Sequence, residues 1–122
     1  MEGGMNLTCL TIHSNFIEEL PPLPPKLEQL DASCTSLRSL PALPLTLRKL
    51  SCLFAAYCEE LEELPDLPSS LRELDCSCCP SLERLPQLAH AGITELDCSN
   101  CFELVELPHM PNSLTSLKAE GL

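Results

Sequence analysis

Apolar residues recur along this chain in a fixed order that neither a single helix nor a single strand explains. A Leu-Pro pair returns every 20 to 24 residues, followed three positions on by a second apolar residue and then by a Leu-x-x-Leu pair. The leucines that open these stretches are Leu20, Leu40, Leu64, Leu85 and Leu107. Repetition at such a period is typical of proteins built from stacked repeats, so the pattern predicts a solenoid.

The Leu-x-x-Leu pair predicts where the strands lie. We number each unit from the first residue of the pair, so that the second leucine is position 4. Position 4 is then Leu10, Leu30, Leu50, Leu74, Leu96 and Leu117. Position 6 is small or apolar and holds Ile12, Ala32, Cys52, Cys76, Cys98 and Ala119. Because these positions alternate with polar ones, each unit should form one short strand with a single buried face.

One such strand cannot bury its apolar face alone, so the units should stack in parallel around a leucine column. The Leu-Pro-x-Leu-Pro stretches that follow cannot form ordinary helices, because proline lacks an N–H donor and forces the preceding residue into extended geometry. We therefore expect a convex side that is extended or polyproline-II-like, with little helix, behind a concave face made of the strands.

Two segments resemble a known repeat family. Residues 7–17 follow the leucine-rich repeat pattern L-x-x-L-x-L-x-x-N/C-x-L, and Leu64–Leu71 is similar to the short L-P-x-L-P-x-x-L repeat of bacterial effectors of the IpaH and YopM type. The resemblance implies a horseshoe-shaped leucine-rich repeat solenoid, of the α/β-horseshoe class, as a single domain over residues 1–122. The expected units are approximately 7–26, 27–46, 47–70, 71–92, 93–113 and a truncated 114–122, with no separate cap or catalytic domain.

The third unit is longer than its neighbours between Leu50 and Leu61. The excess falls in residues 52–60, where Leu53, Tyr57, Leu61 and Leu64 have helical spacing, so a short helix or a bulged turn is expected there. The segment holds Phe54 and the single tyrosine of the chain, Tyr57. We interpret both aromatic side chains as core residues; the alternative is a binding hot spot.

Composition excludes several function classes. The chain has 7 basic and 18 acidic residues and a net charge of −11, which argues against a protein that follows a nucleic-acid backbone. No apolar run approaches the ~18 residues of a membrane span, and the N-terminus does not resemble a secretion signal. We therefore expect no nucleic-acid or membrane partner, and a reducing location: the cytoplasm, or a host cytosol if the protein is a secreted effector.

The nine cysteines allow two interpretations. Cys76 and Cys79, followed by Cys98 and Cys101, have the spacing of a four-thiolate zinc site. The repeat alone also explains them, because Cys76 and Cys98 share position 6, while Cys79 and Cys101 share position 9. At position 9, where Cys58 is also placed, a side chain normally satisfies backbone groups of the turn. We expect no metal and no disulfide, with zinc binding as the alternative.

Acidic residues gather on the face opposite the leucines. At positions 3 and 5, Glu73, Asp75, Glu95 and Asp97 should form a two-by-two acidic patch on adjacent strands, where like charges repel. Such a patch is either a solvated face that prevents aggregation or a surface for a basic protein partner. The predicted partner-binding residues are Asp31, Arg48, Lys49, Arg72, Glu73, Asp75, Glu95 and Asp97.

No active site is expected, and no cofactor. The histidines His13, His90 and His109 fall at different repeat positions, and the chain's four glycines form no phosphate-binding loop. The predicted function is a non-enzymatic protein–protein interaction module that binds through the concave strand face. One alternative is an assembly subunit packed through uncapped ends, with end-to-end association; another is a zinc-binding or redox-sensitive module.

Overall fold

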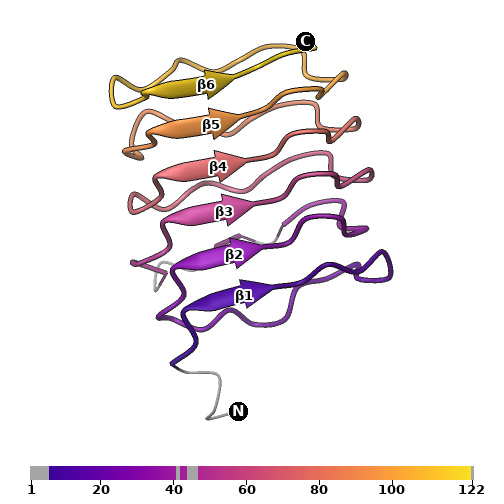
Figure 1. The fold of residues 1–122 in the computed structure, drawn as a ribbon, viewed down its shortest axis with the longest axis vertical. Helices are drawn as coiled ribbons and strands as arrows, with labels where there is room; N and C mark the ends of the chain where they lie inside the picture. The colour runs from indigo at the N-terminus through magenta and orange to yellow at the C-terminus, as the bar shows by residue number, and fades with distance from the viewer. Residues whose placement is uncertain (1–5, 41, 44–46, 122) are drawn as a thin grey trace.

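Six short parallel strands form one sheet in the computed structural model, which describes residues 6–40, 42–43 and 47–121. The strands stack in sequence order, and the chain returns behind the sheet after each one (Figure 1). They are β1 (Cys9–Thr11), β2 (Gln29–Asp31), β3 (Cys52–Phe54), β4 (Glu73–Asp75), β5 (Glu95–Asp97) and β6 (Ser116–Lys118). Within the described ranges there is no helix. The predicted solenoid of parallel strands is confirmed.

A column of leucines at the strand centres holds the stack together. In register from β1 to β6, the column is Leu10, Leu30, Leu53, Leu74, Leu96 and Leu117. The four middle leucines are at most 1% exposed, whereas Leu117 on β6 is 44% exposed. Each strand therefore depends on its neighbours for burial, as expected for a repeat array.

The Leu-Pro stretches line the back of the solenoid without regular secondary structure. Leu64, Leu67, Leu85 and Leu88 point into the core and are at most 8% exposed. Isolated parallel bridges, Ser39 to Glu63 and Glu63 to Arg84, are the pairings there. This confirms the expected extended convex side, although Pro41 and residues 44–46 of the second such stretch lie outside the described residues.

The register of β3 differs from the prediction. Leu53, not Leu50, pairs with Leu30 and Leu74 at position 4, so Leu50 occupies position 1 and the third unit begins there. From Leu53 to Cys58 the spacing then equals that from Leu74 to Cys79. The expected helix or bulge at residues 52–60 is absent, and the extra residues lie before the strand.

A run of three equally spaced leucines explains this error. Leu47, Leu50 and Leu53 are all buried, so the sequence offered two possible registers three residues apart. The chain adopts the register that leaves the turn after β3 regular, so the surplus residues fall before the strand, in a connecting segment where insertions are tolerated. As a result Ala55 takes position 6 in the core. Cys52, expected there, instead lies at position 3 and is only partly buried.

Candidate partner-binding surface

The outward side chains of the strands make one continuous surface, which we call the strand face. At position 3 it carries Cys9, Gln29, Cys52, Glu73, Glu95 and Ser116. At position 5 it carries Thr11, Asp31, Phe54, Asp75, Asp97 and Lys118. Because the strands are in parallel register, equal positions stand side by side, and the charge pattern can be followed from strand to strand.

Four carboxylates meet on β4 and β5, as predicted. Glu73 stands in register with Glu95, and Asp75 with Asp97, at a strand separation of about 4.8 Å. They line a shallow hollow of about 330 Å³. Within the part of the chain that the structure describes, the ion pair found joins His13 and Asp31, so no basic side chain pairs with the patch. The four like charges repel one another. One basic residue, Lys118 on β6, stands next to Asp97 in register and lines the same hollow, but it forms no ion pair with the patch.

The aspartates of the strand face also hold the turns that follow the strands. Asp31 and Asp97 each accept the backbone N–H two residues on, from Ser33 and Ser99, at 3.0 Å. Asp75 accepts both the N–H and the hydroxyl of its serine, Ser77. Sequence reasoning missed this role. The signal was present as Asp-x-Ser at 31–33, 75–77 and 97–99, which is an Asx-turn pattern.

The pKa of the Asp31 carboxyl is lowered. Partial burial raises it, but the hydrogen bonds from Ser33 and the contact with His13, whose Nε2 lies 3.0 Å from Oδ2, outweigh that effect. A depressed carboxyl pKa adds stability above the ordinary value near ~3.9, and this contribution disappears as the pH falls through the lowered value.

Asp31→Asn should therefore cost stability at neutral pH and much less in acid. Asparagine keeps an oxygen for the Ser33 N–H but loses the charge that faces His13. Urea unfolding of both proteins between about pH 6 and pH 3 measures the difference. A difference in unfolding free energy that stays constant over this range would contradict the assignment.

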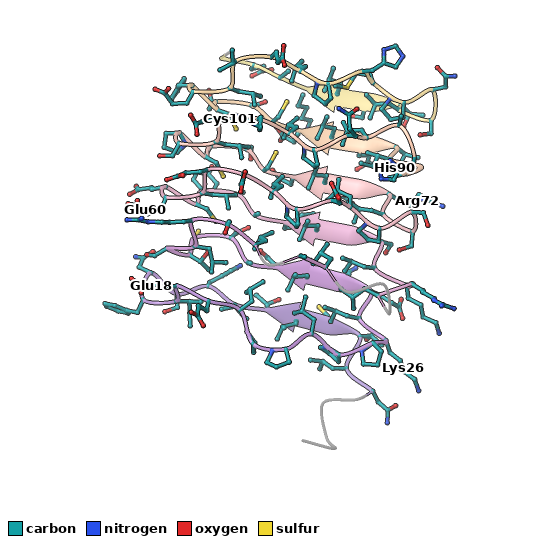
Figure 2. All side chains as sticks on the ribbon, turned by 180° about the vertical axis from the view of Figure 1, so that it is seen from behind. Glu18, Lys26, Glu60, Arg72, His90 and Cys101 are labelled. Atoms are coloured by element: carbon teal, nitrogen blue, oxygen red, sulfur yellow. The ribbon has the colours of Figure 1, made fainter. Side chains whose placement is uncertain are left out.

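The predicted basic contacts do not lie on the strand face. Lys49, expected at position 3, and Arg48 are exposed in the segment before β3, because Cys52 takes position 3 in the observed register. Arg72 is exposed just before β4 and donates to the carbonyls of Ser69 and Leu71. Figure 2 shows Arg72, with Lys26 and His90, on the edge where the chain runs into the strands. We call this the upstream edge.

The two aromatic residues of the third unit, Phe54 and Tyr57, lie in different parts of the fold. Phe54 lies at position 5 of the strand face, between Asp31 and Asp75 in register, and is partly buried. Tyr57 is 62% exposed. The expectation that both aromatic side chains pack in the core is therefore wrong. The register explains this: Tyr57 falls at position 8, where the backbone is left-handed and the side chain leaves the core.

Buried thiols satisfy backbone groups at position 9. The Sγ of Cys58, Cys79 and Cys101 donates to the position 6 carbonyl of the preceding unit, at 3.2, 3.0 and 3.1 Å. Those carbonyls belong to Ala32, Ala55 and Cys76. As predicted, these side chains also reach carbonyls of their own turn, but at 3.5–3.8 Å. The shorter hydrogen bonds tie each unit to the unit before it, which was not predicted.

Comparison with known proteins agrees with this geometry. No protein-family model matches the chain, and no curated protein matches it. Among solved structures, YopM from Yersinia enterocolitica WA-314 is similar, with 30% sequence identity and a TM-score of 0.55. The match covers 95% of this chain and 33% of the YopM chain. The chain is a leucine-rich repeat solenoid. It spans about a third of the length of the YopM chain that it resembles.

The leucine-rich repeat assignment gives a general indication of function. Solenoids of this kind use their extended surfaces to bind other proteins and are typically non-enzymatic. His13 is paired with Asp31, whereas His90 and His109 are exposed elsewhere, so the histidines do not converge. Over the described residues, the structure contains no helix with the length and apolarity needed to cross a membrane.

In this leucine-rich repeat solenoid the zinc-spaced cysteines form two kinds of buried site. Cys76 and Cys98 pack in the core at position 6, and burial raises the pKa of Cys98 to about 11. Cys79 and Cys101 donate to carbonyls. Across residues 6–40, 42–43 and 47–121, no three His, Cys, Asp or Glu side chains are arranged to hold a metal ion. Zinc binding at these cysteines stays an alternative to the prediction of no metal, and elemental analysis of the purified protein tests it.

Cys79→Ala should destabilise the solenoid, because the buried carbonyl of Ala55 would lose its donor. The expected loss of unfolding free energy is about 1–3 kcal/mol, the cost of an unpaired buried polar group. Cys79→Ser keeps a donor and should lose less. Urea unfolding of the three proteins is the measurement, and equal stability of the alanine and serine variants would show that the thiol acts only by filling space.

Proposed function

We propose that this leucine-rich repeat solenoid is a protein-interaction module that binds a basic segment of another protein through its strand face. The observation that supports the proposal is the block of four carboxylates on β4 and β5, which outnumbers the single lysine beside it, Lys118, and forms no ion pair among the described residues. Glu73 and Glu95, together with Asp75 and Asp97, would contact lysine or arginine side chains of the partner.

The energetics of the free protein favour this assignment. Equal charges directly beside one another on a sheet are destabilising, by up to about 1 kcal/mol a pair. A basic partner would replace that repulsion with attraction and would also be steered toward the surface, which raises the association rate. The strand face therefore gains more from a basic partner than from a neutral one.

The two kinds of acidic residue would contribute differently. Asp31, Asp75 and Asp97 are engaged in the turns, so they supply charge but have little freedom to adjust. Glu73 and Glu95 make no turn contact and would form the adaptable ion pairs. Phe54, beside this patch on β3, would add apolar contact area, as hot spots at interfaces often do.

The basic residues of the predicted binding set would act from the side. Arg72 lies on the upstream edge, next to the strand face, and Arg48 and Lys49 are exposed in the segment that leads into β3. There they would contact acidic groups that flank the basic segment of the partner. Charges at the rim of an interface contribute orientation more than affinity.

A capture experiment with paired baits tests the proposal. Three immobilised baits would be exposed to one lysate, and the captured proteins compared by quantitative mass spectrometry. The baits are wild type, the strand-face double variant Glu73→Gln/Glu95→Gln, and the control double variant Glu18→Gln/Glu19→Gln. The control pair removes the same charge from exposed residues after β1. A basic protein enriched by wild type and by the control, and lost with the strand-face variant, is expected. Equal capture by all three baits would remove the strand face from the account.

A further inference from the structure

The turn after each strand contains a repeated left-handed residue at position 8. Cys34, Tyr57, Cys78 and Asn100 have φ values of 59°, 58°, 56° and 58°, and Gly121 follows the pattern at 75°. Glycine and asparagine adopt this conformation readily, whereas a bulky tyrosine rarely does. The strained backbone directs the side chain of Tyr57 into solvent beside the strand face, where it does nothing for the core.

A hollow of about 360 Å³ opens beside Tyr57. We call it the aromatic hollow; it is lined by positions 8 and 10 of three successive units, namely Tyr57, Glu59, Cys78, Pro80, Asn100 and Phe102. Tyr57 is 62% and Phe102 is 69% exposed. The two rings belong to units two turns apart, which is about 10 Å by strand spacing. The unit of Cys78 and Pro80 lies between them.

The surroundings of the aromatic hollow are acidic. Glu59 lines it, and Glu60 and Glu103 are exposed next to its lining residues in the chain. Figure 2 shows Glu60 and Glu18 along this edge of the solenoid, opposite the edge that carries Lys26 and Arg72. Exposed apolar rings within a field of carboxylates favour a ligand that is both cationic and flat.

We infer that the aromatic hollow binds an arginine side chain from an extended basic segment of a protein partner. A guanidinium group can stack on the faces of Tyr57 and Phe102 while it pairs with the carboxylate of Glu59. Arginine fits better than lysine, because its planar, weakly hydrated head stacks on rings, whereas an ammonium is compact and strongly hydrated. This site lies at the turns that follow the strands and is separate from the strand face of the proposed function.

The chain supplies its own reporter for the test. It has one tyrosine and no tryptophan, so its tyrosine fluorescence comes from Tyr57 alone. The probe is a capped octapeptide of alternating glycine and arginine, titrated at about 0.15 M salt to screen long-range attraction. We expect this peptide to cause a saturable fluorescence change. A peptide with lysine in place of each arginine should bind at least about twofold more weakly, and one with citrulline, which is neutral, should cause no change.

Phe102→Ala should weaken binding of the arginine peptide about two- to fivefold, which is the range of exposed cation–π contacts. Phe16→Ala is the matched control, because Phe16 is also exposed, at 93%, but lies after β1, away from the hollow. Glu59→Gln should weaken binding as Phe102→Ala does. Both changes are at exposed positions, so the variants should remain folded.

Three results would overturn the inference. The first is that Phe102→Ala and wild type bind the arginine peptide with equal affinity, and the second is that the citrulline peptide changes the fluorescence as much as the arginine peptide does. The third is that the double variant Glu73→Gln/Glu95→Gln loses the fluorescence response. The last result would place the peptide on the strand face. Because that variant leaves the aromatic hollow intact, the test also separates the two surfaces: failure of one site leaves the other unaffected.

Discussion

Leu74→Ala is expected to lower the free energy of unfolding by about 2–5 kcal/mol, the range for truncation of a buried leucine. Leu74 is 1% exposed at the centre of β4, where it packs between Leu53 and Leu96 in register. The loss combines the transfer energy of the removed atoms with the cavity left behind. Because each unit contacts only its neighbours, a defect in the middle of the stack weakens two interfaces.

Leu117→Ala makes the same chemical change at the same repeat position and is the matched control. Leu117 is 44% exposed on β6 and has a strand on one side only among the described residues, so its truncation should cost less than half as much. Urea unfolding followed by circular dichroism measures both variants. Equal losses would contradict the account, because they would mean that burial in the leucine column does not determine stability.

Glu73→Lys combined with Glu95→Lys is expected to weaken binding of the captured partner at least about tenfold. The change removes two attractions and adds two repulsions, each worth up to about 1 kcal/mol at an exposed site, and 1.4 kcal/mol corresponds to a factor of ten. Both glutamates lie outside the Asx turns that Asp75 and Asp97 hold, so the fold should be unaffected.

The matched control for this reversal is Glu18→Lys combined with Glu19→Lys, which changes the net charge equally at residues away from the strand face. Isothermal titration calorimetry with the purified partner measures both variants, and urea unfolding verifies that each is folded. If the control weakened binding as strongly as the strand-face variant, net charge rather than the position of the charge would govern the interaction.

Most of the solenoid could be predicted from the sequence, because its stability depends on a repeated apolar position. The central leucine lies ten positions after the leucine of the preceding Leu-Pro pair in β2, β4 and β6, and eleven positions after it in β5, so register follows from counting to within one residue. The predicted register of the third unit was wrong because Leu47, Leu50 and Leu53 are equivalent in the pattern. Only the packing of neighbouring units decides between Leu50 and Leu53 at the strand centre.

The acidic patch was predicted because β4 and β5 have the same Glu-Leu-Asp sequence at the same repeat positions. The second role of the aspartates, as hydrogen-bond acceptors in the turns, was not predicted because it depends on turn geometry. The position of Lys49 was predicted wrongly because it rested on the mistaken register. The exposure of Tyr57 follows from the same register, since counting from Leu53 places it in the left-handed turn.

The dependence of partner affinity on salt tests the central claim most directly. The experiment measures how tightly wild type and the double variant Glu73→Gln/Glu95→Gln bind the captured partner, from low to high ionic strength. If the strand-face carboxylates bind a basic segment, the affinity of wild type falls steeply with added salt, and that of the variant falls less, because screening removes attractions that the variant no longer has. Identical salt dependence of the two proteins would contradict the account.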